Sequence, residues 1–148
     1  MKLILLDSGP LGILTNPNVT QKTVHANRWF ADHLAAGNRF FVPEITDYET
    51  RREFILIGSH ASIVLLDNLI AHNTFLPLST NVMHLAANLW ALARQMGLQT
   101  APNHSIDIDV ILAAQAISLN DPSVVIATKN VNHLGRFAPA EDWQFITP

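Results

Sequence analysis

Cysteine is absent from this chain of 148 residues, which excludes disulfide bonds, thiolate nucleophiles and cysteine-based zinc sites. Charged residues are scarce, at 14%, while hydrophobic residues make up 49%, and this balance argues against a disordered chain. A basic excess is also missing, because the formal net charge is −3 and the pI is about 6.1. Domains that hold nucleic acid by charge alone tend to have a pI above about 9. Any contact with nucleic acid must therefore be local or assisted by a metal ion.

Long apolar runs are missing as well, since no stretch approaches the roughly 18 apolar residues of a membrane span. The apolar start of the chain stops at Asp7, short of the roughly 7 to 15 residues in the hydrophobic region of a signal peptide. We therefore interpret residues 2–7 as a strand and expect a cytoplasmic protein. The length is typical of one globular domain, which would span residues 1–148.

Strands and helices alternate along the sequence. Continuous apolar runs at residues 2–7 and 124–127 are typical of strands buried on both faces. Further strands are predicted at 40–42 and 74–78, with a last edge strand at 143–146, and helices at 11–14, 20–36, 43–57, 60–73, 80–96 and 108–119. This order predicts an α/β fold with a mostly parallel central sheet of about five strands, covered by helices on both faces.

Two of the predicted helices carry specific signals. Thr80 is the expected cap of the helix at 80–96, whose core-facing stripe is Val82, Leu85, Leu89, Leu92 and Met96. After a polar loop that contains a proline, Ser105 or Asp107 is expected to cap the last long helix. Small residues at 113, 114 and 116 would let that helix pack closely against its neighbour.

Polar side chains follow the apolar runs where ligands bind in open parallel sheets, at the carboxyl ends of the strands. These residues are Asp7, Thr46 and Glu49, and Thr128 with Asn130. Asp107 and Asp109 stand among apolar residues near a helix start, where a buried carboxylate needs a counter-charge. The cations nearest in sequence, Arg51, Arg52 and Lys129, are too few to neutralise them all. Mg²⁺ or Mn²⁺, which prefer carboxylate oxygens, is the natural counter-charge.

Each candidate also has a purely structural interpretation. Asp7 or Asp107 could cap a helix, Glu49 could lie on a solvated face with Arg52 and Glu53, Asn130 could be a turn residue, and Lys129 a solvated loop residue. Asp109 is the stronger functional candidate of the aspartate pair because it falls one or two residues inside the predicted helix. The histidines at 25, 33, 60, 72, 84, 104 and 133 show no zinc-site spacing, so we expect surface or packing roles.

The same residues carry a resemblance to PIN-domain ribonucleases, particularly the toxins of VapBC-type toxin–antitoxin pairs. The matching segments are Leu5–Leu11, Val42–Glu49, Asp109–Ala116 and Ile126–Leu134, in the same order and with similar separations, so that the resemblance spans nearly the whole chain. In that family an aspartate ends the first strand, a glutamate follows a P-x-I-T-x-x-E pattern and another aspartate precedes an alanine-rich helix. The resemblance assigns these positions to Asp7, Glu49 and Asp109. A fourth acidic position of the family is Asn130 here, which removes one negative charge.

What the resemblance implies is a PIN-like domain that hydrolyses RNA phosphodiester bonds with a metal-activated water. Asp7, Glu49 and Asp109 would hold one or two Mg²⁺ or Mn²⁺ ions, with Asn130 and Asp107 completing the shell. Thr128 would orient a water or ligand, and Arg51, Arg52 and Lys129 would contact phosphate. The implied partners are RNA, a small antitoxin protein and a second copy of the chain. Phe54–Ile57 and Ile63–Leu66 could form a groove for an amphipathic partner, although we expect most of them to pack in the core.

Two rival functions fit parts of the sequence. A receiver-like phosphoacceptor also gathers aspartates around Mg²⁺ and places a threonine and a lysine after late strands, as Thr128 and Lys129 are placed. However, no aspartate ends the strand at 74–78 to accept the phosphoryl group. An interaction module with the same fold and a weakened metal site is the second rival, and Asn130 favours it.

Overall fold

The computed structural model describes the backbone of residues 1–97 and 103–148, and the side chains of all of these except 103–106. The polar loop predicted after Gly97 and the proposed cap Ser105 lie outside the described residues or side chains. Five parallel strands form the sheet in the order β3-β2-β1-β4-β5: β1 (Leu3–Leu6), β2 (Arg39–Pro43), β3 (Thr74–Leu76), β4 (Val124–Thr128) and β5 (Ala140–Asp142). The predicted α/β class and mostly parallel five-stranded sheet are confirmed.

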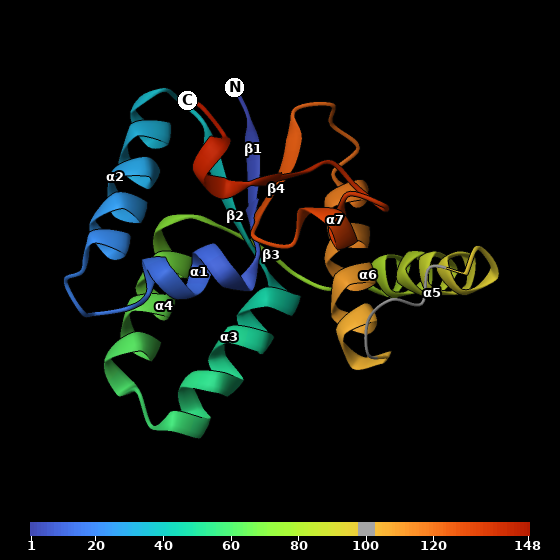
Figure 1. Cartoon of the computed structure of the whole chain (residues 1–148), viewed down its shortest axis with the longest axis horizontal. Coiled ribbons are helices and arrows are strands. Elements are labelled where there is room, and N and C mark those ends of the chain that lie inside the picture. Colours follow the sequence, from blue (N-terminus) through green and yellow to red (C-terminus); the bar gives the residue numbers. More distant parts are fainter. Residues whose placement is uncertain (98–102) are drawn as a thin grey trace.

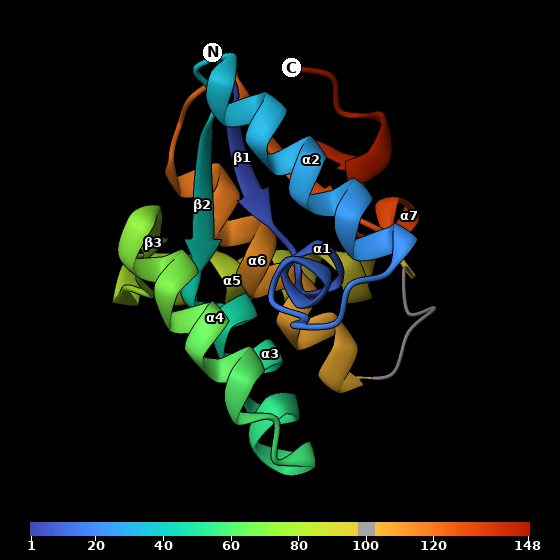
Figure 2. The same ribbon diagram turned by 90° about the vertical axis from the view of Figure 1, so that its left-hand side faces the viewer.

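Helices cover both faces of the sheet in the part of the chain that the structure describes (Figures 1 and 2). The helices are α1 (Ser8–Leu14), α2 (Gln21–Ala35), α3 (Glu44–Ile57), α4 (His60–His72), α5 (Thr80–Gln95), α6 (Asn103–Ser118) and α7 (Val131–Leu134). A 3-10 turn, η1 (Trp143–Phe145), follows β5. None of the described helices is long and apolar enough to cross a membrane.

Alternation along β1 divides the core into two layers. Ile4 and Leu6 point to the face covered by α1, α2 and α4, where they pack with Leu11 and Trp29. Leu3 and Leu5 point to the opposite face and pack against α6. All four β1 residues are buried, as expected for a central strand whose two faces are both covered.

The long helix α5 differs from its prediction. Its cap is Ser79, whose hydroxyl accepts a hydrogen bond from the backbone N–H of Val82, and not Thr80. The predicted apolar stripe is only partly buried, because Leu92 and Met96 are exposed whereas the small residues Ala86 and Ala93 are buried. The helix packs mainly on α6, and small residues on both helices permit this close approach.

Helix α6 begins at Asn103, before both caps predicted for it. Asp109 is therefore the seventh residue of this helix, further inside it than the sequence indicated. The alanine cluster on α6 performs the predicted role, since Ala113, Ala114 and Ala116 are all buried against the sheet or α5.

The predicted last strand at 143–146 is wrong, because β5 occupies Ala140–Asp142 and the chain then turns through η1. Trp143 and Ile146 gave a strand-like apolar pattern, but Trp143 lies in the turn and Ile146 directly after it, and both are buried in the core. The Asp142 carboxylate accepts the Gln144 backbone N–H and caps the turn, while Trp143 packs edge-on against Trp29 at 5.4 Å between ring centroids.

The end of α3 exposes apolar side chains that the sequence placed mainly in the core. Ile55, Leu56 and Ile57 are 64%, 79% and 71% exposed, and Val64 on α4 is also exposed. Phe54 packs partly against the core and Leu66 is fully buried. The core interpretation is therefore wrong for the three isoleucine and leucine residues at the α3 terminus, because the C-terminal end of α3 extends away from the carboxyl ends of the strands (Figure 2).

Candidate metal centre

A pocket of about 270 Å³ opens at the carboxyl ends of β1 and β4. These strands adjoin in the sheet at the place where the strand order reverses, the usual ligand position in open α/β sheets. The pocket is lined by residues from four separate segments: Asp7, Ser8, Gly9, Glu49, Asp109, Lys129 and Asn130. The structure thus brings together the three carboxylates and the asparagine that the sequence singled out.

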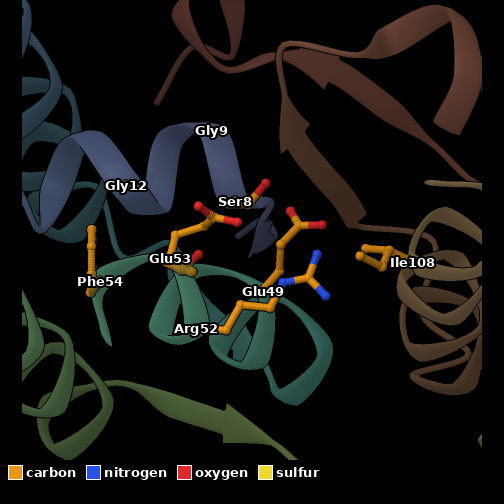
Figure 3. Close-up of a pocket in the computed structure, with 9 residues that line it drawn as sticks. Ser8, Gly9, Gly12, Glu49, Arg52, Glu53, Phe54 and Ile108 are labelled. Carbon is orange, nitrogen blue, oxygen red and sulfur yellow. The ribbon is translucent and has the colours of Figure 1, made fainter. Parts of the chain in front are cut away.

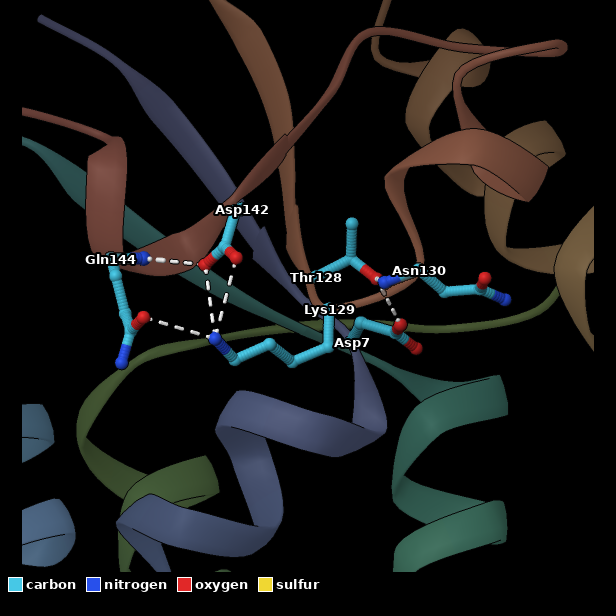
Figure 4. Close-up of polar contacts among 6 residues, drawn as sticks. All are labelled: Asp7, Thr128, Lys129, Asn130, Asp142 and Gln144. Carbon is cyan, nitrogen blue, oxygen red and sulfur yellow. Dashed lines mark hydrogen bonds and ion pairs between the residues drawn. The ribbon is translucent and has the colours of Figure 1, made fainter.

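Asp7 is fixed by two hydrogen bonds at the junction of β1 and α1, of which Figure 4 shows the one from Thr128. Its Oδ1 accepts the backbone N–H of Ser8 at 2.8 Å, and its Oδ2 accepts the Thr128 hydroxyl at 2.6 Å. Burial raises the pKa of Asp7, and the charge of Glu49 raises it further, while the two hydrogen bonds oppose the rise. Asp7 is also the N-cap of α1, so the capping and site interpretations describe the same side chain.

Thr128 is fully buried at the end of β4 and connects two pocket residues. Its hydroxyl donates to Asp7 and accepts the backbone N–H of Asn130 at 2.8 Å. The second bond fixes the direction of the hydroxyl proton toward Asp7, because the oxygen serves as an acceptor on its other side. Thr128 therefore orients a carboxylate of the pocket.

The pKa of Asp109 is raised by its surroundings in the pocket. Burial, followed by the charges of Asp7 and Glu49, raises its pKa from 3.8 to about 7. Burial is the larger cause, and the charges add to it because three carboxylates line one small pocket and each negative charge opposes ionisation of the others. A nearby cation would stabilise the charged form of a carboxylate in these surroundings.

Glu49 lies on α3, the helix that begins directly after the last residue of β2. The buried Thr46 hydroxyl donates to the Pro43 carbonyl at 2.9 Å in the first turn, which makes Thr46 a structural residue of this turn. Glu49 is partly buried and lines both the carboxylate pocket and an adjoining groove of about 460 Å³. The fully solvated interpretation of Glu49 is therefore wrong.

The three predicted phosphate contacts occupy different places. Arg51 binds Asp47 at 2.9 Å and Asp67 of α4 at 2.7 Å, and these partners raise its pKa, so it joins α3 to α4 and does not line the carboxylate pocket. Arg52 lines the adjoining groove with Glu49 and Ile108 (Figure 3). Its guanidinium lies 5.1 Å from the centroid of the Tyr48 ring.

Lys129 lines the pocket with its side chain, but its ammonium turns toward the far side of the site (Figure 4). The Nζ atom lies 3.3 Å from both Asp142 carboxylate oxygens and 3.1 Å from the Gln144 amide oxygen. Asp107 is exposed and lines a separate groove between α5 and α6 with Met83 and Trp90. Neither residue brings its charged group to the three carboxylates.

His133 is a pocket neighbour that sequence reasoning missed. Its Nδ1 lies 3.9 Å from Oδ2 of Asp109, across the contact between α7 and α6. The histidine spacings typical of zinc sites do not indicate His133, because its partner is an aspartate 24 positions away in the sequence. Its spacing of three residues from Asn130 on a short helix was the one available signal.

The donor set fits a hard divalent cation, since three carboxylates and an amide supply oxygen ligands and the mutual repulsion at Asp109 would be relieved by positive charge. Within the described side chains, however, no three histidine, aspartate or glutamate groups are already close enough together to hold an ion. Binding would therefore require the carboxylates to close toward one another.

Comparison with protein-family models gave no match, and comparison with curated proteins gave none either. Solved structures do match. A chain of VapBC from Salmonella typhimurium bound to DNA is 20% identical with a TM-score of 0.68, covering 97% of this chain and 99% of its own. A chain of VapBC-1 from nontypeable Haemophilus influenzae is 19% identical with a TM-score of 0.67, at 95% and 98% coverage. A chain of VapBC2 from Rickettsia felis, bound to a DNA fragment from the promoter, is 16% identical with a TM-score of 0.68, at 94% and 97% coverage. The fold of this chain is therefore the α/β fold found in VapBC toxin–antitoxin structures, in agreement with the resemblance to PIN-domain toxins.

Proposed function

We propose that this chain is a divalent-metal-dependent endoribonuclease, a PIN-like domain spanning residues 1–148 that acts in the cytoplasm as the toxin of a toxin–antitoxin pair. The observation that carries the proposal is the convergence of Asp7, Glu49 and Asp109 on one pocket at the carboxyl ends of β1 and β4. Its setting, a fold found in VapBC structures, supports the same function.

Each pocket residue has a task in this proposal. Asp7, Glu49 and Asp109 hold the Mg²⁺ or Mn²⁺, and Asn130 contributes a neutral oxygen from the α7 end of the pocket. When bound, the cation supplies activation of the attacking water and stabilisation of the leaving oxygen. Thr128 keeps Asp7 in position through its 2.6 Å hydrogen bond.

The RNA phosphate must approach an acidic pocket, and two features of the chain ease this approach. The cation reverses the local charge at the carboxylates. Arg52 lines the groove that adjoins the pocket through Glu49, and it is the predicted phosphate contact whose position suits that task best. We assign no phosphate contact to Arg51, whose guanidinium is bound by Asp47 and Asp67. Lys129 would contact the phosphate only after its ammonium group had moved away from Asp142.

We propose an antitoxin partner by likeness to the VapBC complexes, and a homodimer because the family resemblance implies one. The exposed apolar residues Ile55, Leu56 and Ile57, beside the groove lined by Phe54 and Arg52, are suited to an amphipathic partner segment. A peptide in this groove would lie next to Glu49 and could block the pocket.

The experiment is cleavage of a mixed RNA substrate by the purified chain with Mn²⁺ or Mg²⁺, compared with Asp7→Asn and with the metal chelated. Cleavage that needs the metal and is lost in Asp7→Asn supports the proposal. Metal binding without cleavage of any RNA would instead support the second candidate, an interaction module with a weakened site. That candidate is favoured by the neutral Asn130 at the position where the resemblance implies a fourth acidic residue.

The receiver-like alternative finds no support in the fold. Its doubly wound sheet has the order 2-1-3-4-5, whereas this sheet has the order 3-2-1-4-5. In addition, β3 ends at Leu76, so no aspartate lies at the position of a phosphoacceptor.

A further inference from the structure

His133 and Asp109 face each other at the edge of the carboxylate pocket. The imidazole Nδ1 lies 3.9 Å from the carboxylate Oδ2, and the two side chains are 34% and 14% exposed. This separation is longer than the 2.7–3.2 Å of a hydrogen bond between nitrogen and oxygen. The two atoms are therefore close without a hydrogen bond between them, and both belong to potential metal ligands.

Helix α7 presents His133 on the same side as Asn130. Asn130 is the N-cap of α7 and lines the pocket, and the backbone N–H of His133 donates to the Asn130 carbonyl at 3.2 Å. This backbone bond closes one turn between Asn130 and His133, so the two residues lie one turn apart. One short helix thus brings two neutral donors, an amide and an imidazole, to the Asp109 side of the pocket.

The 3.9 Å separation suits ligands that share an ion. Two atoms each about 2.1 Å from a metal are about 3 Å apart in neighbouring positions and about 4.2 Å apart in opposite positions. Small side-chain movements would bring the Asp109 oxygen and the His133 nitrogen into this range.

Imidazole nitrogen changes which cation the pocket prefers. Mg²⁺ favours oxygen ligands and retained waters, whereas first-row transition ions accept imidazole readily. A neutral ligand also adds to the coordination without adding repulsion to three carboxylates that already raise the pKa of Asp109. We propose that His133 is a nitrogen ligand of the cation held at Asp109 and makes the site select Mn²⁺ over Mg²⁺. The inference rests on the metal site of the proposed function.

The test is titration calorimetry of the metal-free full-length chain with Mn²⁺ and, separately, with Mg²⁺. His133→Ala is expected to weaken Mn²⁺ binding by about tenfold or more, the scale of a lost partner in a metal site, and to leave Mg²⁺ binding within about twofold. His84→Ala is the matched control, because His84 is an exposed histidine on α5 that does not line the pocket, and both affinities should stay unchanged.

A spectroscopic readout identifies the ligand directly. Pulsed electron paramagnetic resonance of Mn²⁺ bound to the wild type is expected to show coupling to an imidazole nitrogen, and His133→Gln should remove it. The Gln variant retains a polar side chain of similar reach and provides a second variant should the alanine variant fail to fold.

The failures of the two proposals are distinguishable. If Asp7→Asn abolishes binding of both ions while His133→Ala leaves the ratio of Mn²⁺ to Mg²⁺ affinity unchanged and the nitrogen coupling is missing, the role of His133 is overturned and the carboxylate site stands. If the wild type binds neither ion, the metal site itself is overturned, and the role of His133 with it.

Discussion

The Thr128 hydroxyl donates a 2.6 Å hydrogen bond to Oδ2 of Asp7, and this bond joins the carboxyl ends of β1 and β4 beside the carboxylate pocket. Both residues follow or end buried apolar strands, so the positions of the two side chains depend on the parallel register of Leu6 with Ala127. The orientation of the first carboxylate is therefore set by the sheet itself.

Replacing Thr128 by valine tests this bond. The variant keeps the branched shape but removes the donor to Asp7, so the Asp7 carboxylate loses a stabilising partner and its preferred orientation. We expect Mn²⁺ affinity to fall by about tenfold and the unfolding free energy to fall by about 1–3 kcal/mol. Calorimetry and chemical denaturation measure these changes, and Thr128→Ser, which keeps the hydroxyl, should restore most of the affinity. Equal affinities in all three proteins would show that the bond has no part in metal binding.

The raised pKa of Asp109 predicts an unusual pH dependence in the metal-free protein. Between pH 3.8 and about 7 the folded chain holds a proton on Asp109 that the unfolded chain has released. The folded state is therefore favoured by acid, and this contribution is lost as the pH rises toward 7, by at most about 4 kcal/mol at about 1.4 kcal/mol per pKa unit.

Asp109→Asn removes that dependence and serves as its control. With metal chelated at pH 8, the variant should melt higher than the wild type, at about 2–4 °C for each kcal/mol gained. The difference should shrink as the pH approaches 4. An equal or lower melting temperature for the variant at pH 8 would contradict the clustering of carboxylates.

His33 predicts an opposite trend through a buried network near the C-terminus. Its Nε2 lies 3.0 Å from the Ile146 carbonyl and its Nδ1 lies 2.9 Å from the Asn38 amide nitrogen, whose amide oxygen accepts the backbone N–H of Lys2. These bonds assign the proton to Nε2, so a second proton at Nδ1 would face another donor. Burial lowers the pKa of His33, and the charge of Lys2 lowers it further, whereas the Ile146 carbonyl and the charge of Asp32 raise it.

The direction of this pH dependence follows from the neutral imidazole of His33, which the folded state favours. The unfolded chain takes up the proton at about pH 6.5, so the stabilisation is complete above that pH and is lost as the pH falls toward the lower folded pKa. Measurements in the Asp109→Asn background remove the opposing effect. In that background, the unfolding free energy should fall between pH 7.5 and pH 5. Adding His33→Gln should make this fall less steep, and equal slopes with and without His33→Gln would refute the assignment.

Arg51 and Arg52 form a matched pair for testing contact with RNA. Arg51→Gln should leave RNA cleavage within about twofold and cost at most about 1 kcal/mol of stability, because its partly exposed ion pairs with Asp47 and Asp67 only join α3 to α4. Arg52→Gln should weaken cleavage by about tenfold or more through a higher KM, because Arg52 lines the groove beside Glu49. Reversed effects would move the RNA path to the α4 side of α3.

Sequence patterns were sufficient for the features that depend on strong local signals. The buried runs of β1 and β4 identified two central strands, and the carboxyl ends of these strands indicated Asp7 and Thr128. The sheet class followed from the alternation of strands and helices. The role assigned to Glu49 came from a family resemblance, since its spacing alone left a solvated helix face open. Asp109 was already a candidate because it falls inside the predicted helix among apolar residues, and the resemblance gave it a role.

Features that depend on tertiary packing were not predictable in this way. Trp143 and Ile146 had the composition of a strand, yet Trp143 lies in the 3-10 turn, Ile146 follows it, and both are buried in the core that includes Trp29 of α2. Arg51 and Arg52 are neighbours in sequence, and only the position of α4 separates an ion-paired arginine from one that lines the groove. His133 meets Asp109 through the packing of α7 on α6, which no local pattern records.

The most direct test of the carboxylate centre is a Mn²⁺ titration of thermal stability for the wild type, Asp7→Asn and Asp109→Asn, with Asp121→Asn as an exposed control outside the pocket. Ligand binding to the folded state raises the melting temperature with concentration. The account predicts a rise for the wild type and the control, and none for the two pocket variants. A wild-type melting temperature that stays constant up to millimolar Mn²⁺, or a rise that both pocket variants retain, would contradict it.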